Sequence, residues 1–124
     1  MTVLAIAFGG ALGSVLRYLM GGVVQRATHA GFPYGTLAVN VIGCLMIGIL
    51  IQYFMNSEPT SEVRAFLIVG FCGGFTTFSA FSMETIGLLT AGSYLRASAY
   101  VLSSVVLCLT ATAAGMTLTR SLSH

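Results

Sequence analysis

The sequence predicts an all-α integral membrane protein with four transmembrane helices. Of its 124 residues, 56% are hydrophobic and only 6% are charged, and the mean hydropathy is +0.96. A soluble domain typically carries about 25% charged residues, which keep its surface wet. Spanning a bilayer takes about 20 residues per helix, so four passes use nearly the whole chain. We therefore expect residues 1–124 to form one domain that is bathed in lipid.

The boundaries of the helices follow from polar and turn-forming interruptions. Pro33 and Pro59 lie in two of the connections, and Gly92 lies in the third. Proline and glycine are the strongest local signals for a turn. An even number of spans places both termini on the same side of the membrane. Four apolar runs share the length of a membrane span, at 3–24, 34–55, 65–91 and 94–118.

The arginines give a weak instruction about orientation. Arg64 and Arg120 fall on the side of the termini, Arg26 and Arg96 fall on the opposite side, and Arg17 lies within the first helix. Orientation is set by an excess of Lys and Arg on one side. Such a balance allows insertion in both directions and hence an antiparallel homodimer. The alternative is that one weak bias still fixes a single orientation.

The third span is unusual at its centre. Paired glycines, Gly73 and Gly74, are followed by paired threonines, Thr76 and Thr77. This composition favours a helix broken in mid-membrane, and freed backbone groups there must face protein or a polar cavity. Discontinuous helices of this kind bind ions with their carbonyl groups. The alternative is a continuous helix with a glycine-rich packing seam.

Polar side chains within the spans are mainly hydrogen-bond donors. Phe78 and Phe81 lie one turn apart after the predicted break, where ring edges carry partial positive charge; helical spacing of this kind also occurs in ordinary packing. Because donors dominate, a small, hard anion is the expected passenger. The polar positions are Thr36 and Asn40 in the second span and Tyr100, Ser104, Cys108 and Thr112 at four-residue intervals in the fourth.

One carboxylate lies well inside a span. Ionisable groups in a membrane are candidate functional residues. Glu84 could pair with an arginine such as Arg17, or it could move protons.

The sequence disfavours several other classes of protein. A net charge of +2 without a basic cluster gives no reason to expect nucleic acid as a partner. The sequence lacks a nucleophile with a base and a set of metal-ligand residues, so we do not expect an enzyme. Cys44, Cys72 and Cys108 form no C-x-x-C motif. We expect them to be free thiols that pack as small hydrophobes.

The centre of the chain resembles a known family. Residues 73–85 read GGFTTFSAFSMET and are similar to the motif G-G-x-T-T-F-S-T-F-S-x-E of the Fluc (CrcB) fluoride channels. Residues 35–40 and 13–17 support the resemblance, as do the length and the four-helix layout. The resemblance implies an antiparallel, dual-topology homodimer in the bacterial inner (plasma) membrane, which passively exports fluoride and protects the cell from its toxicity.

The resemblance also implies roles for individual residues. The ring edges of Phe78 and Phe81 would contact fluoride, and the Asn40 amide would project into the pore. Carbonyl groups of Gly73 and Thr76 from both protomers would hold a central, structural Na⁺. Thr36, Glu84 and Arg17 are possible accessory residues. The polar track of the fourth helix would consist of Tyr100, Ser104 and Thr112.

Two positions depart from the family pattern. Cys108 stands where the resemblance predicts a serine, and a thiol is the weaker donor. Ala80 replaces a threonine between the two phenylalanines. The rival hypothesis is a small multidrug-type, proton-coupled antiporter. That mechanism needs a carboxylate in the first helix, where this chain has Arg17 and no acid.

Overall fold

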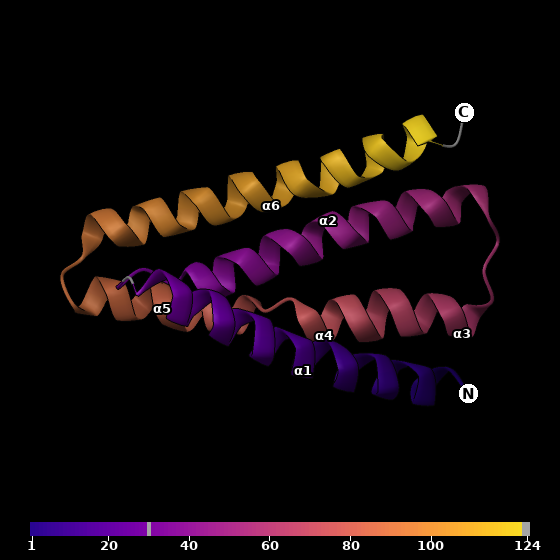
Figure 1. The fold of residues 1–124 in the computed structure, drawn as a ribbon, viewed down its shortest axis with the longest axis horizontal. Helices are drawn as coiled ribbons and strands as arrows, with labels where there is room; N and C mark the ends of the chain where they lie inside the picture. The colour runs from indigo at the N-terminus through magenta and orange to yellow at the C-terminus, as the bar shows by residue number, and fades with distance from the viewer. Residues whose placement is uncertain (30, 123–124) are drawn as a thin grey trace.

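The computed structural model describes residues 1–29 and 31–122. Four helical stretches in this part of the chain are long and apolar enough to cross a membrane. This confirms the prediction of four spans. The third stretch, Ser61–Thr90, is divided into several pieces. The elements are α1 (Thr2–Thr28), α2 (Tyr34–Asn56), α3 (Ser61–Arg64), η1 (Ala65–Cys72), α4 (Gly73–Phe75), α5 (Phe78–Thr90) and α6 (Tyr94–Leu122), shown in Figure 1.

The helices extend beyond the apolar runs from which they were predicted. The third stretch begins at Ser61 rather than at residue 65, because Thr60 caps it: its hydroxyl accepts a hydrogen bond from the Val63 amide at 3.4 Å. The fourth continues to Leu122 rather than ending at 118. Helical hydrogen bonding does not stop where hydrophobicity stops, so composition underestimates the length of helices whose ends are polar.

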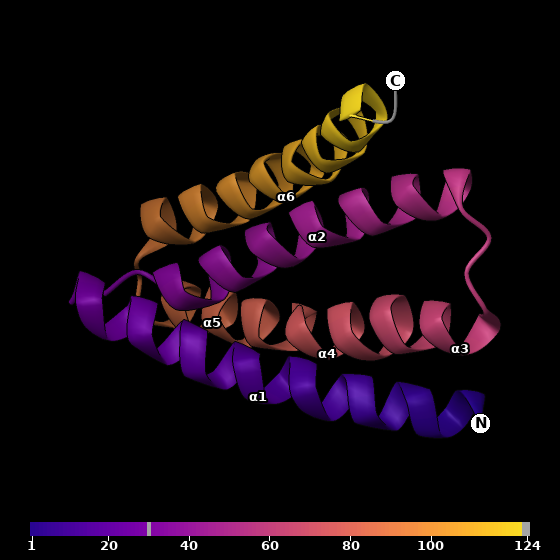
Figure 2. The same ribbon diagram turned by 45° about the vertical axis from the view of Figure 1, so that its right-hand side comes forward.

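The helices run roughly side by side in an elongated bundle. Figures 1 and 2 show α2 between α6 and the third span, and α1 on the other side of that span. The start of α1 and the end of α6 lie at one end of the bundle, together with the connection from α2 to α3, as an even number of passes requires. The Gly92 turn, with a φ of 76°, lies at the opposite end.

Glycines of α1 pack directly against the backbone of the third span. A Cβ atom at Gly9 would lie 2.9 Å from the Phe71 nitrogen, and one at Gly13 would lie 2.8 Å from the Phe75 nitrogen. A real Cβ cannot occupy either position. Small residues let helix backbones approach in a membrane, where lipid supplies no hydrophobic drive. This seam therefore belongs to the packing within one chain.

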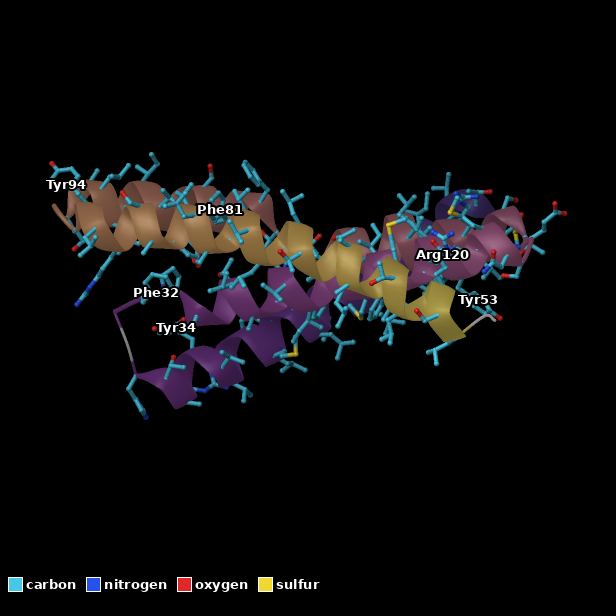
Figure 3. The ribbon with its side chains drawn as sticks, turned by 90° about the horizontal axis from the view of Figure 1, so that it is seen from above. Phe32, Tyr34, Tyr53, Phe81, Tyr94 and Arg120 are labelled. Atoms are coloured by element: carbon cyan, nitrogen blue, oxygen red, sulfur yellow. The ribbon has the colours of Figure 1, made fainter. Side chains whose placement is uncertain are left out.

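Large apolar side chains cover the outside of the bundle. Phe8, Leu12 and Leu95 are among those more than half exposed, at 68%, 52% and 85%. Exposed tyrosines occur near the ends of the bundle: Figure 3 shows Tyr94 at one end and Tyr53 at the other. Tyrosine is typical of the two membrane–water interfaces. The surface of the bundle thus matches a bilayer, because its centre is apolar and exposed tyrosines lie near both of its ends.

Candidate ion pathway

The third span is broken at its two threonines, as predicted. Thr76 (φ −81°, ψ 156°) and Thr77 (φ −149°, ψ 112°) are extended and separate α4 from α5. The glycines before them remain helical. The segment before α4, η1, is a π-helix, which the sequence analysis did not predict. Such segments are rare and often occur at functional sites.

Side chains from other helices satisfy the backbone at the break. The Asn40 amide donates to the Thr77 carbonyl at 3.0 Å, and its oxygen accepts from the Thr77 amide at 2.7 Å. Arg17 donates to the Thr76 carbonyl at 3.3 Å. The Thr77 hydroxyl accepts from the Ala80 amide at 3.2 Å and so caps α5. The break is thus a built feature, stabilised from α1 and α2.

A cavity of about 420 Å³ adjoins the break, and we call it the aromatic cavity. Four residues that the sequence singled out for an ion path meet in its wall: Asn40, Phe78, Phe81 and Ser104. Ser104 is 7% exposed, and in the described part of the chain no hydrogen bond engages its hydroxyl. This hydroxyl therefore can donate to an occupant of the cavity.

Two aromatic side chains of this cavity, Phe78 and Phe81, and the Tyr100 ring behind them are tilted against one another. The ring centroids of Phe78 and Phe81 are 5.3 Å apart with an angle of 47°, and those of Phe81 and Tyr100 are 5.1 Å apart with an angle of 51°. The Phe81 ring of α5 therefore contacts the Tyr100 ring of α6. Tilted rings direct some edges, rather than only faces, toward the space between them.

Glu84 lies at the centre of a hydroxyl network. Its carboxylate accepts from the Thr36 hydroxyl at 2.7 Å and from the Tyr100 hydroxyl at 2.6 Å. Arg17, which the sequence offered as a partner for Glu84, donates to the Thr76 carbonyl at 3.3 Å. Tyr100 is 0% exposed, so Glu84 engages the polar tip of a fully buried ring.

The accessory residues line a second space, which we call the arginine cavity. It measures about 900 Å³ and lies between α1, α2 and α5. Arg17, Thr36 and Glu84 all contribute to its wall. Thr77 and Ala80 line it too, so this cavity also reaches the break.

The remaining predicted positions lie as follows. The Thr112 hydroxyl is 3.1 Å from the Cys44 carbonyl oxygen and 3.2 Å from that of Cys108, within the contact of α2 and α6. Gly73 is exposed. The three cysteines, which were expected to be free thiols that pack as small hydrophobes, are free and all line the aromatic cavity. Cys44 follows Asn40 by four residues on α2, and Cys108 follows Ser104 by four residues on α6. These spacings indicated a common site only once the structure showed that the two helices pack together.

The chain is similar to proteins of one family along nearly its whole length. A family model described as "CrcB-like protein, Camphor Resistance (CrcB)" matches residues 4–116. A "Fluoride-specific ion channel FluC" of Geobacter sulfurreducens is 50% identical over 122 residues, which cover 98% of each chain. Proteins with the same name from Rhizobium meliloti and Rhizobium johnstonii are 49% and 47% identical, over 97% and 94% of each chain. The broken third span, the polar network around it and these similarities agree, and the chain belongs to the CrcB family of multi-pass membrane proteins.

Proposed function

We propose that the protein is a fluoride-selective channel that conducts F⁻ passively across the bacterial inner membrane. Its similarity to relatives named as fluoride-specific channels supports this function. The observation that carries it is the aromatic cavity, where Asn40, Phe78, Phe81 and Ser104 meet beside a break in a membrane helix. The rival antiporter would need a proton-exchanging carboxylate on α1, and α1 provides Arg17.

Fluoride in this cavity exchanges water for protein donors. Channels select ions with groups that replace the hydration shell, while binding weakly enough to release the ion. The Ser104 hydroxyl is one donor. An asparagine amide has two N–H groups, and Asn40 uses one of them on Thr77. The edges of Phe78 and Phe81 add weak, polarised C–H contacts.

Export follows from the acid–base chemistry of fluoride. Neutral HF crosses lipid and dissociates in the less acidic cytoplasm, where the ion is trapped. A passive pore lets F⁻ leave down its gradient without a cofactor or ATP. This direction of flow protects the cell from fluoride toxicity.

The functional unit is an antiparallel homodimer. Phe78 is 77% exposed in the single chain, although the family motif assigns it to the ion path. The arginine cavity is also open to the outside of the helix bundle in the single chain. A second copy in the opposite orientation encloses both, and the balance of arginines on the two faces is compatible with such insertion.

A structural Na⁺ lies at the centre of this dimer. Carbonyl oxygens are suitable ligands for a hard cation, and one chain offers those of Gly73 and Thr76, which is half of a site. Thr76 shares its carbonyl with Arg17 at 3.3 Å. A carbonyl has two lone pairs, so it can accept this hydrogen bond and still face the ion.

Fluoride efflux from liposomes that contain the purified protein tests the function. We expect rapid F⁻ efflux, with chloride efflux far slower. Phe81→Ile should suppress fluoride efflux while the dimer persists on size-exclusion chromatography. Leu95→Ile, at an exposed position on the outside of α6, is the matched control and should leave efflux unchanged.

Three results would contradict the proposed channel, and a fourth would contradict only the role of Phe81. Absence of fluoride efflux or comparable chloride efflux would exclude a fluoride channel. Fluoride efflux that requires an opposing proton gradient would indicate an antiporter. Unchanged efflux in Phe81→Ile would leave the channel in place and exclude the role of this ring.

A further inference from the structure

Cysteines from three membrane spans meet at one place. Cys44 of α2, Cys72 of η1 and Cys108 of α6 are free thiols, and all three line the aromatic cavity. Cys44 and Cys108 are also joined through Thr112, whose hydroxyl lies within hydrogen-bonding distance of the carbonyl oxygens of both residues. Two cysteines thus line one cavity from α2 and α6, which pack against each other.

Thr112 holds these two cysteines in register. Its hydroxyl lies within hydrogen-bonding distance of both their carbonyl oxygens, at 3.1 Å for Cys44 and 3.2 Å for Cys108. One turn beyond Cys44, a Cβ at Gly48 would lie 3.0 Å from the Thr112 carbonyl carbon, so the two backbones touch there. The close approach of the two backbones therefore brings Cys44 and Cys108 to the same level of the bundle.

We propose that Cys44 and Cys108 form a binding site for one soft, two-coordinate cation of the class Hg²⁺, Ag⁺ or Cu⁺. Sulfur ligands select soft metals. These d¹⁰ ions accept two thiolates in a linear arrangement, whereas structural Zn²⁺ needs four ligands. Within residues 1–29 and 31–122 no group of three or more His, Cys, Asp or Glu side chains could hold a metal. A thiol pair thus suits the first class of ion and not the second.

Binding exchanges protons for the metal. The thiolate is the species that ligates a metal, so each thiol releases its proton to water as an S–metal bond forms. With HgCl₂ the metal gives up two chloride ions, and no atom changes its oxidation state. The resulting dithiolate of Hg²⁺ is neutral, which avoids the cost of an unpaired charge in an apolar setting.

The occupied site obstructs the ion path. Asn40, Phe78 and Phe81 line the same cavity as the thiol pair, so a metal bridging Cys44 and Cys108 fills space that an ion would cross. This consequence rests on the proposed function, whereas the binding of the metal does not. Soft metals are then inhibitors of fluoride efflux in this chain.

Retention of mercury by the purified protein is the first test. The protein is treated with HgCl₂ in detergent and desalted in excess glutathione, which removes mercury held by a lone thiol. We expect one retained Hg²⁺ per chain by elemental mass spectrometry and two thiols protected from alkylation. Cys72→Ser should retain the metal as the parent does, while Cys44→Ser and Cys108→Ser should each lose it. Zn²⁺ added in the same way should not be retained.

Fluoride efflux from liposomes is the second test. HgCl₂ should abolish efflux in the parent and in Cys72→Ser, and excess dithiothreitol should restore it. Cys44→Ser and Cys108→Ser, each compared with its own untreated rate, should resist the block. Two independent variants are used, and size-exclusion chromatography verifies that each is folded.

The outcomes separate this site from the proposed function. Equal mercury retention in the parent and in both Cys44→Ser and Cys108→Ser would overturn the site, as would retention of Zn²⁺. A protein that conducts fluoride but retains no mercury would refute the site alone. One that retains mercury but never conducts fluoride would refute the proposed function alone.

Discussion

Asn40 replaces backbone hydrogen bonds that the broken span cannot make for itself. Its amide group bonds to both the carbonyl and the amide nitrogen of Thr77, at 3.0 and 2.7 Å. We predict that Asn40→Ala destabilises the fold more than any loss of a single surface hydroxyl. The reason is that two main-chain groups lose their partners at once, at a depth where lipid offers none.

The magnitude follows from these two bonds. Interhelical hydrogen bonds in membranes average about 0.6 kcal/mol each, so their loss alone would cost about 1 kcal/mol. An orphaned buried group costs about 1–3 kcal/mol, and two of them cost about 2–6 kcal/mol. We expect the higher range, because the extended backbone at Thr77 has no adjacent helical carbonyl to use instead. Asn40→Asp keeps the acceptor and loses the donor, and should cost about 1–3 kcal/mol.

The assay is reversible unfolding of the purified protein in mixed micelles with increasing sodium dodecyl sulfate, followed by circular dichroism. Ser103→Ala is the control, since the Ser103 hydroxyl bonds only within its own helix, to the Tyr100 carbonyl at 3.2 Å. This control should change the free energy of unfolding by no more than about 0.5 kcal/mol. If Asn40→Ala matches the control, Asn40 does not support the break.

Three further predictions follow from the packing and the polar groups. Gly48→Ala should lower the free energy of unfolding by about 1–3 kcal/mol, because the new Cβ would collide with the Thr112 backbone. At Gly87 a new Cβ would meet no atom within 4 Å, so Gly87→Ala should stabilise the fold by up to about 1 kcal/mol. Equal effects of the two variants in the unfolding assay would refute this packing. Glu84→Ala should lower stability by about 1–3 kcal/mol, since it orphans the fully buried Tyr100 hydroxyl, and Glu84→Gln should lower it less; the reverse order would contradict the network. Replacement of Na⁺ by N-methyl-D-glucamine should lower the fraction of dimer measured by single-molecule photobleaching in liposomes, and an unchanged fraction would argue against a structural Na⁺.

Some features of the site were accessible from the sequence because they are local. Paired threonines after paired glycines favour a break in a membrane helix, so the break at Thr76 and Thr77 was predictable from composition. The one-turn spacing of Phe78 and Phe81 placed both rings on one face. Their meeting with Ser104 needed the pairing of α5 with α6, which the four-residue register of polar positions on α6 anticipated.

Other features depend on which helices are neighbours. Asn40 was expected to offer its amide to an ion, but the side-chain oxygen and one side-chain N–H group bond to the backbone of Thr77. Glu84 was expected to meet Arg17 or to move protons, and it meets two hydroxyl groups. Each of these outcomes is a competition between partners on different helices. The sequence identifies the possible partners of a polar group, but it does not give the distances between them.

The sequence by itself determined that the chain is surrounded by lipid, that it crosses the membrane four times, and where the third span is broken. These properties depend on how hydrophobic and how helical short stretches of chain are, and 6% charge with four apolar runs leaves little choice. Only the tertiary structure decided that α1 packs on a π-helix, that Arg17 bonds to the break, and that Cys44 and Cys108 line one cavity. These contacts join residues far apart in the chain, and their free energy depends on the close approach of backbones, which no local pattern specifies.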